Sequence, residues 1–251
     1  MPANNTTLTP PGIIDYKAIY EVKFWIYGLV IPIVCLPGIV GSVVSMLIFS
    51  NKRMRSSLHI LLAGLSFFDT VVLLMALFIY PPMLFCAEAV IGRGMCDLFW
   101  TSCLVLFPLS LIAQFCSVWT CVLITCDRFL AIKYPFRSRV WATNDKAYLA
   151  LSVVTVFGLV YGIPSTLELK HDQEGNIVPT QLRTNEIYIK VYKVWCYLVF
   201  YFLIPWAIMI VLNFFVAREV RRASRRRAQL STQMAFLQSA MKLFSSVDQK
   251  A

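Results

Sequence analysis

Five long apolar segments decide what this chain can fold into. A helix needs about 20 mostly apolar residues to cross a bilayer, because 1.5 Å of rise per residue must span roughly 30 Å of hydrocarbon. A helix also satisfies its own backbone polar groups there. The composition agrees, with 59% hydrophobic residues and a mean hydropathy of +0.69. The sequence therefore predicts an all-α membrane protein, a transmembrane helix bundle with spans at residues 24–50, 58–84, 98–131, 147–167 and 194–217.

The connectors between these spans differ in charge. The connectors rich in lysine and arginine are 51–57, 132–146 and 218–251, and the nearly balanced ones are 1–23, 85–97 and 168–193. Cytoplasmic loops collect positive charge, so the first set is predicted to be cytoplasmic and the N-terminus extracellular. The net charge of +10 also suits nucleic acid, but no soluble domain is left to carry such a site, so a nucleic-acid partner is not expected.

The N-terminal segment supports this orientation. It lacks the apolar core of a cleaved secretory signal, so the first span is expected to act as an uncleaved insertion signal. Asn4 and Asn5 each begin an Asn-x-Thr triplet, which is the acceptor sequence for N-glycosylation, and no other such triplet occurs in the chain. We therefore expect a glycoprotein with its N-terminus outside the cell.

Asp69 is a carboxylic acid in the middle of the second apolar segment. A charge near the bilayer centre is costly and is commonly functional. One interpretation is a protonated carboxyl that bonds to a neighbouring helix. The other is a residue facing the bundle interior whose binding of a cation or proton acts as a switch.

The third span carries a polar face. Its members recur at steps of three and four residues, which places them on one side of a helix: Ser110, Gln114, Ser117, Cys121, Ile124 and Arg128. This face is predicted to point toward partner helices rather than lipid. Small polar residues also serve simply to pack helices together, whereas the larger amide of Gln114 is a candidate ligand contact.

The third span ends in Asp127-Arg128-Phe129, and Phe136 follows in the next connector. By itself an Asp–Arg pair at a membrane boundary can be an interfacial anchor. With its surroundings, however, it resembles the rhodopsin-like G-protein-coupled receptors, whose third helix ends in Asp/Glu-Arg-Tyr before a proline and a bulky apolar residue. Asp69, Ser117 and Pro205 match further positions of that family's pattern.

The resemblance implies roles for these residues. Arg128 would pair with Asp127 at rest and reach toward a heterotrimeric G protein on activation, and Phe136 would contact the same G protein. Asp69 and Ser117 would help to hold a sodium ion. Pro205 would open the fifth helix at the ligand level, because proline lacks a backbone donor.

Within the family the sequence is similar to FMRFamide-like neuropeptide receptors. The residues that carry this likeness include Pro108 to Gln114, Tyr161 with Pro164 and Glu168, Leu182 to Asn185 with Tyr188, and Asn213. The resemblance implies a plasma-membrane receptor for a short amidated peptide, with Gln114, Glu168 and Glu186 as contacts and no cofactor. The other interpretation of Glu168 and Glu186 is that they are solvated loop residues.

Several features depart from the family pattern. Cys103 stands where the family keeps a disulfide cysteine, but the connector 170–190 contains no cysteine to pair with it. Four cysteines lie toward the extracellular side, and their pairing stays open: Cys86, Cys96, Cys103 and Cys196. The chain shows no sixth or seventh apolar segment, so we expect a truncated isoform, a fragment or a partial gene product.

The last connector also contains an apolar stripe. Its members repeat at three and four residues: Leu230, Met234, Leu237, Met241 and Phe244. Beside the arginines of 218–227, this pattern is typical of an amphipathic helix lying on an anionic membrane surface. The other interpretation is a cytoplasmic extension of the fifth helix.

Three other functions compete with a peptide receptor. A truncated, non-signalling receptor could interfere with its full-length version by pairing. A transporter or channel subunit is disfavoured because no two matching helices are interrupted. An intramembrane enzyme is disfavoured because the spans contain no Ser/His dyad, paired aspartates or metal-ligand cluster.

The acceptor triplets give a direct test of orientation. Glycosidase treatment of the chain expressed in animal cells is expected to increase its gel mobility, and Asn4→Gln with Asn5→Gln is expected to abolish that shift. An epitope tag at the N-terminus that is accessible only after permeabilisation would contradict the predicted topology.

Overall fold

The computed structural model describes residues 21–51, 56–87, 92–134, 143–171 and 177–248. Within these residues, five helices are long and apolar enough to cross a membrane: Glu21–Phe49, Ser57–Cys86, Arg93–Lys133, Asn144–Thr166 and Glu186–Arg225. The prediction of an all-α membrane bundle is therefore confirmed. The predicted glycosylation acceptors Asn4 and Asn5 and the predicted G-protein contact Phe136 lie outside the described residues.

The first four spans are η1 (Phe24–Val30) with α2 (Ile31–Phe49), then α3 (Ser57–Ala87), α4 (Arg93–Lys133) and α6 (Asn144–Thr166). A short hairpin, β1 (Leu169–His171) and β2 (Ile177–Pro179), and the short helix α7 (Gln181–Thr184) lead to the fifth span. That span consists of α8 (Glu186–Tyr188), η3 (Ile189–Cys196), η4 (Leu198–Leu203) and α9 (Ile204–Asp248).

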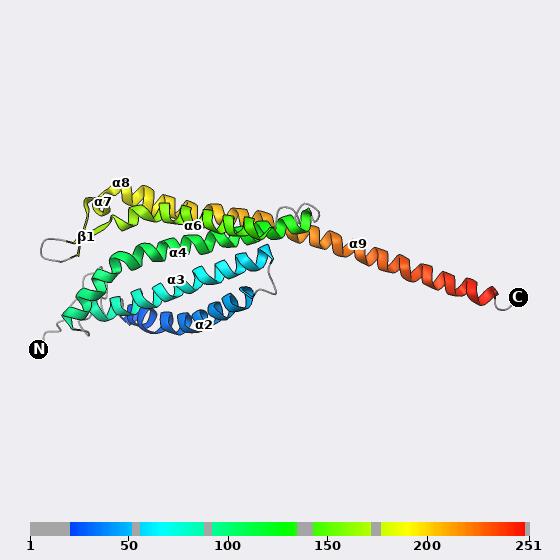
Figure 1. The fold of residues 1–251 in the computed structure, drawn as a ribbon, viewed down its shortest axis with the longest axis horizontal. Helices are drawn as coiled ribbons and strands as arrows, with labels where there is room; N and C mark the ends of the chain where they lie inside the picture. Colours follow the sequence, from blue (N-terminus) through cyan, green and yellow to red (C-terminus); the bar gives the residue numbers. More distant parts are fainter. Residues whose placement is uncertain (1–20, 52–55, 88–91, 135–142, 172–176, 249–251) are drawn as a thin grey trace, which may run out of the picture.

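The helix α4 occupies the centre of the bundle. It contacts α3 on one side and both α6 and α9 on the other, while α2 packs against α3 at the edge (Figure 1). The β hairpin and the start of the fifth span lie at one end of the bundle. The other end contains the start of α6 and the point where α9 leaves the bundle (Figure 1). Because α3, α6 and α9 all pack against α4, the surface of α4 determines how the bundle is assembled.

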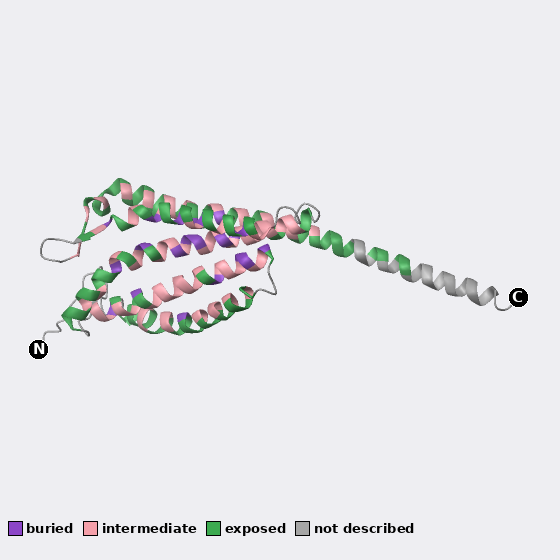
Figure 2. Cartoon of the chain, in the orientation of Figure 1, coloured by how far each residue is buried: buried purple, intermediate pink, exposed green. Residues whose placement is uncertain are grey.

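Burial follows the distribution expected for a protein in lipid. Buried residues concentrate on α4 and on the faces turned toward it, whereas Cys35 is the one buried residue of α2 (Figure 2). Large apolar side chains such as Val105, Phe157 and Ile210 are 67%, 64% and 63% exposed. In water such a surface would aggregate, but hydrocarbon solvates it as well as a protein core does.

Small residues let α6 approach α4 closely. Gly158 and Gly162 are buried on α6 and face the middle of α4. A Cβ atom at Gly158 would lie 2.9 Å from the Sγ of Cys116, and one at Gly162 would lie 2.5 Å from Cγ1 of Ile112. Lipid offers no hydrophobic driving force for helix association, so this close van der Waals packing is a main interaction that holds the two helices together.

The fifth span begins earlier than the sequence indicated. Residues 186–193, predicted to belong to an extracellular loop, already form α8 and part of η3. Asn185 caps this start, since its side-chain oxygen accepts hydrogen bonds from the backbone N–H groups of Ile187 (2.9 Å) and Tyr188 (3.3 Å). Polar residues at a helix start hid the boundary, because the apolar run begins only near Val194.

Pro205 is fully buried and lies at the start of α9, directly after the wide π-helical turns of η4. A proline inside a helix removes one backbone donor, so the preceding turn cannot complete the regular ladder. The wider turns of η4 accommodate that missing bond. The family resemblance assigned the opening of this helix to Pro205, and the widened turns of η4 lie directly before it.

The fifth span continues as α9 through Asp248 without a described break and projects well past the other helices (Figure 1). The sequence had favoured a separate amphipathic helix lying on the membrane for the stripe that includes Leu230 and Met234. That interpretation is corrected: the structure has the alternative, a straight extension of the fifth helix. Good helix formers fill this segment and no glycine or proline ends it, so nothing local stops the helix.

A disulfide joins Cys86, at the end of α3, to Cys96, at the start of α4. This pairing settles the connectivity that the sequence left open. Cys103 and Cys196 are free, and Cys103 is 1% exposed. Cys103 therefore acts as a small apolar residue in the bundle rather than as half of a bridge.

The close approach of α4 and α6 generates a stability prediction. Replacing Gly158 and Gly162 together by alanine places two methyl groups where Cys116 and Ile112 already lie. We expect a loss of about 1–3 kcal/mol, because overpacking forces the helices apart. The check is a thermal unfolding curve of the detergent-purified chain. Gly41→Ala is the matched control, since a Cβ atom there meets nothing within 4 Å; equal losses in both variants would contradict the prediction.

Candidate functional site

Asp69 on α3 meets Ser117 on α4 in the middle of the bundle. The Ser117 hydroxyl donates a hydrogen bond of 2.5 Å to Oδ1 of Asp69, and both residues are half-buried. The structure thus brings together the two residues that the sequence analysis assigned to a cation site. One carboxylate and one hydroxyl are oxygen ligands suited to a hard cation, but such an ion takes six or so. No cluster of three or more metal-ligating side chains is found among the described residues.

The predicted polar face of α4 turns out not to be its most buried face. Gln114, Ser117 and Cys121 are half-buried, whereas Cys116 and Thr120 next to them are 0% exposed, and Cys116 faces Gly158 of α6. Ser117 contacts α3 as expected, but within the described residues Gln114 has no hydrogen-bond partner. The face therefore borders a partly open side of the bundle rather than its core.

At the other end of α4, Asp127 and Arg128 do not form an ion pair with each other in the described part of the chain. Asp127 instead accepts a hydrogen bond of 2.8 Å from the hydroxyl of Ser57 at the start of α3. Arg128 is exposed. This corrects the expectation of an Asp127–Arg128 pair: consecutive residues on a helix point about 100° apart, and Asp127 turns toward α3.

Phe129 packs toward the fifth span. Its ring centroid lies 6.3 Å from that of Phe215 on α9, and Nζ of Lys133 lies 5.1 Å from the Phe129 ring and 5.9 Å from the Phe215 ring. A cation over two aromatic rings is attracted by both. The end of α4 is thus tied to α3 through Asp127 and to α9 through Phe129, leaving Arg128 free to point outward.

A column of aromatic rings joins α4, α6 and the fifth span. Tyr161 of α6 stacks on Phe115 (5.5 Å between centroids) and on Tyr192 (5.2 Å), whose hydroxyl donates to the Tyr161 carbonyl. Tyr201, 3% exposed, donates a hydrogen bond of 2.9 Å to the carbonyl of Leu111. Stacked and edge-on rings with satisfied hydroxyls make this a rigid part of the bundle.

Glu168 continues this column at the hairpin end, and it is not a solvated loop residue. It is 6% exposed, its Oε2 lies 2.7 Å from Nζ of Lys193, and its Oε1 accepts a hydrogen bond of 2.9 Å from the hydroxyl of Tyr188. Its carbonyl also accepts from the backbone N–H of Thr180 after β2 at 2.9 Å. We call the set Glu168, Lys193 and Tyr188 the latch, because it joins the hairpin to the fifth span.

Glu186, the other predicted acidic contact, is exposed. Among the described residues it pairs only with Lys190 one turn along, at 3.7 Å, and the side chains of Glu186 and Lys190 are 86% and 74% exposed. A surface pair of this kind contributes little. Of the two glutamates, the solvated-loop interpretation therefore fits Glu186 and fails for Glu168.

A cavity of about 750 Å³ lies at the hairpin end of the bundle. Aromatic and aliphatic side chains form most of its wall, with Asp97 and Arg183 as its charged members. The lining residues are Met83, Asp97, Trp100, Thr101, Cys103, Phe107, Leu169, Ile177, Pro179 and Arg183. A mostly apolar wall with a few polar groups is the usual form of a ligand site.

Nothing in the sequence singles out Asp97 or Lys193. Asp97 stands at the end of a connector that was predicted to be a loop, where a single acid is ordinary. Lys193 meets Glu168 only because the hairpin folds back over 25 residues, and no local pattern encodes that contact. Arg183 had been noted only as part of the likeness to FMRFamide-like receptors.

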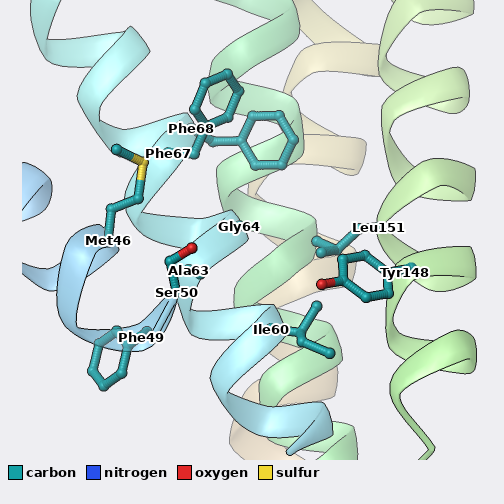
Figure 3. Close-up of a pocket in the computed structure, with 10 residues that line it drawn as sticks. All are labelled: Met46, Phe49, Ser50, Ile60, Ala63, Gly64, Phe67, Phe68, Tyr148 and Leu151. Carbon is teal, nitrogen blue, oxygen red and sulfur yellow. The ribbon is translucent and has the colours of Figure 1, made fainter. Parts of the chain in front are cut away.

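A second cavity, of about 380 Å³, lies between α2, α3 and α6 near the opposite end (Figure 3). It has no charged lining residue, and Phe67 and Tyr148 beside it are 52% and 53% exposed. It is lined by Met46, Phe49, Ser50, Ile60, Ala63, Gly64, Phe67, Phe68, Tyr148 and Leu151. This groove opens toward lipid, so it is poorly suited to a polar ligand.

Ser56 and His59 lie close together, with the Ser56 hydroxyl 2.6 Å from Nδ1 of His59. The pair is three residues apart at the exposed start of α3. A nucleophile needs a base held by a third group and a nearby site for the reacting atom. Among the described residues no third group forms a hydrogen bond with His59. We therefore interpret the Ser56–His59 hydrogen bond as a local contact at the start of the helix.

The fold is that of a multi-pass helical membrane protein. The family described as "7 transmembrane receptor (rhodopsin family)" matches residues 41–247. The chain belongs to this family, which is a family of receptors and not of enzymes.

Relatives of known description include neuropeptide receptors. The chain is 31% identical over 221 residues to an FMRFamide receptor of Drosophila melanogaster, covering 84% of this chain and 40% of that protein. It is 30% identical over 210 residues to an FMRFamide peptide receptor of Caenorhabditis elegans, covering 80% and 48%. It is 25% identical over 189 residues to the human substance-P receptor, covering 73% and 44%. The chain thus spans about half or less of the length of these relatives.

The latch yields a prediction about stability. Lys193→Met leaves the buried carboxylate of Glu168 without its cation, so we expect a loss of about 1–3 kcal/mol, seen as a lower unfolding temperature. Adding Glu168→Gln should restore part of it, since the uncompensated charge is then gone. Glu186→Gln, which breaks only the exposed pair, is the control and should change little. Equal loss in both single variants would contradict a special role of the latch.

Proposed function

We propose that this chain forms part of a receptor that binds a short peptide of the FMRFamide-like kind at the hairpin end of the bundle and, in the complete receptor, a heterotrimeric G protein at the other end. The single observation that carries the proposal is the cavity containing Asp97, Trp100, Phe107 and Arg183. Family membership and the two FMRFamide receptor relatives support a peptide as its occupant. In this proposal the N-terminus and the cavity are extracellular, the membrane is the plasma membrane, and no cofactor takes part.

The charges of the described residues support Asp97 as the acidic contact. The carboxylate of Glu168 is already held by Lys193 and Tyr188, so it has little attraction left for a ligand cation. Asp97 is exposed on the cavity wall and forms no ion pair with any described residue. A carboxylate there can form a bidentate hydrogen bond with the guanidinium group of a peptide arginine. In one-letter code, the peptide named for the relatives, FMRFamide, contains an arginine.

Gln114 lies deeper than the cavity wall. It is seven residues beyond Phe107 on the same helix, which is about 10 Å further along the axis. A ligand that reaches Gln114 would therefore have to pass Phe107. We propose Asp97 and Arg183 as the primary polar contacts of the ligand. Gln114 is proposed as a contact at the deepest point of the site, and Glu186 as a peripheral contact.

The mid-membrane pair suits a role in switching. We propose that Asp69 and Ser117 supply two oxygen ligands of a sodium ion, whose binding favours one arrangement of α3 and α4. The short hydrogen bond between them supports this proposal, since it holds both oxygens at one place. The protonated carboxyl that bonds across helices remains the alternative for Asp69.

The opposite end suits G-protein contact. We propose that the exposed guanidinium of Arg128 is the principal contact, with Asp127 and Phe129 holding the end of α4 in place through Ser57 and Phe215. Phe136, which follows α4 in the sequence, is proposed as a further contact. A ligand shifts such a site only through contacts that differ between two states of the bundle.

The half-buried polar face of α4 supports one more proposal. Polar groups on a partly open face favour association with other helices in lipid. We therefore propose that residues 1–251 expressed alone pair with a full-length receptor and do not themselves activate a G protein. Membrane lipid is proposed as a further partner, at the exposed sides of the bundle. A transporter or channel subunit finds no support in the family match.

The test is peptide binding to membranes from cells that express the chain. A panel of labelled amidated peptides is applied, matched in length, with arginine or citrulline at the same position. We expect arginine-containing peptides to bind better, and Asp97→Asn to weaken their binding by about tenfold, because a charge-assisted hydrogen bond contributes about 1.5–3 kcal/mol.

Glu186→Gln serves as the control, because it removes an acid from the same end without touching the cavity. As a peripheral contact, Glu186 should matter far less, so this variant should weaken binding much less than Asp97→Asn does. Absence of binding by any amidated peptide would overturn the proposed ligand class. Equal loss in Asp97→Asn and Glu186→Gln would contradict the assignment of the cavity.

A further inference from the structure

An arginine cluster begins where the apolar part of α9 ends. Ala217 closes the apolar run, and the next ten residues contain six arginines and a single acid, Glu219. The backbone remains one helix throughout, so spacing along the sequence determines direction around the axis. Four of the arginines have described, exposed side chains: Arg218, Arg221, Arg222 and Arg225.

These four arginines lie on one side of the helix. Their spacing of zero, three, four and seven residues places them within about 100° of one another around the axis. Together they extend about 10 Å along it. We call these four residues the arginine stripe.

Little within the chain neutralises the arginine stripe. Arg222 pairs with Glu219 at 2.9 Å, an exposed pair one turn apart. The other three form no ion pair with any described residue. Four like charges so close together repel, and such an arrangement on a helix is stabilised when an external anion binds.

The position of the stripe relative to the membrane indicates which anion. The polar headgroup layer on each side of the hydrocarbon is about 5–8 Å deep. Arg218 follows the apolar run directly, so the first turn of the stripe lies inside this layer and Arg225 lies near its outer edge. A lipid headgroup is therefore already present at the stripe, whereas a protein partner would have to displace it.

The chemistry of the guanidinium group indicates which kind of lipid headgroup the stripe would bind. Each arginine presents a planar fork that can hold two phosphate oxygens at once. Residues three and four apart on a helix have Cβ atoms about 5–6 Å apart, so neighbouring forks can grip separate phosphates on one ring. A headgroup with several phosphates uses the stripe more completely than a headgroup with one.

We propose that the arginine stripe is a binding site for a phosphoinositide, a membrane lipid whose headgroup carries several phosphates. The site is formed by α9 alone and is separate from both cavities. It does not depend on the peptide ligand.

The test uses the whole chain reconstituted in phosphatidylcholine nanodiscs, which expose both leaflets and so make the result independent of orientation. Either a bisphosphorylated phosphatidylinositol or phosphatidylserine is included, and the lipid retained by the chain is counted by native mass spectrometry. We expect the phosphoinositide to be retained preferentially. Replacing the stripe by glutamine (R218Q/R221Q/R222Q/R225Q) should reduce its retention by at least about tenfold.

Two further variants test whether binding depends on the shape of the guanidinium group and on the location of the charges, rather than on net charge alone. Replacing the stripe by lysine keeps the charge and removes the forks, so retention should fall to an intermediate level. The variant R93Q/K170Q/R183Q/K190Q removes four charges at the opposite end of the bundle and should retain the lipid normally. All eight replaced side chains are exposed, so the variants should stay folded, and size-exclusion chromatography checks this.

Three outcomes would overturn the proposal. Unchanged retention in the glutamine variant would show that the stripe does not bind the lipid. Equal retention of phosphatidylserine would show attraction to any anionic surface. Capture of an acidic peptide such as polyglutamate in preference to the phosphoinositide would assign the stripe to a protein partner instead.

Discussion

Hydrogen bonds that pass from one helix to another through hydrocarbon are the interactions on which this structure depends. Apolar helices gain little from meeting each other in lipid, so small residues and polar groups decide where they meet. The bonds from Ser117 to Asp69, from Ser57 to Asp127 and from Tyr201 to the carbonyl of Leu111 all involve α4. They fix α3 on one side of α4 and the fifth span on the other. The glycines of α6 complete the arrangement by letting that helix lie against Cys116.

The extracellular and cytoplasmic ends, in the proposed orientation, differ in how they use charge. At the hairpin end, the latch neutralises its carboxylate internally and gives the loop a fixed position beside the cavity. At the other end, Arg128 and the arginine stripe remain exposed and unneutralised by described residues apart from Arg222. The hairpin end thus combines a fixed loop with an acid on the cavity wall, Asp97, that pairs with no described residue, and this suits a shaped pocket. An end with free cations suits anionic surfaces and partners. This difference is consistent with a receptor that recognises a ligand on one side and engages larger partners on the other.

Much of the fold could be predicted from the sequence, because spans are encoded locally. Apolar length predicted five helices, and the steps of three and four placed Ser117 on the face that meets Asp69. Contacts between distant segments were not encoded in this way. The pairing of Glu168 with Lys193 depends on the path of a hairpin, and the turn of Asp127 toward Ser57 depends on how α3 and α4 cross. The continuous α9 remained one of two interpretations for a different reason: an apolar stripe beside arginines looks the same on a surface helix and on an extension.

The uninterrupted α9 has a mechanical consequence. From Pro205 to its end the helix is about 65 Å long, at 1.5 Å per residue. A straight rod of that length acts as a lever with its pivot at the proline, where the wide turns of η4 already loosen the ladder. A tilt of about 5° at the pivot would move the far end by about 6 Å, roughly one helical pitch. Small rearrangements around the aromatic column can thereby be converted into displacements large enough to change what a partner touches.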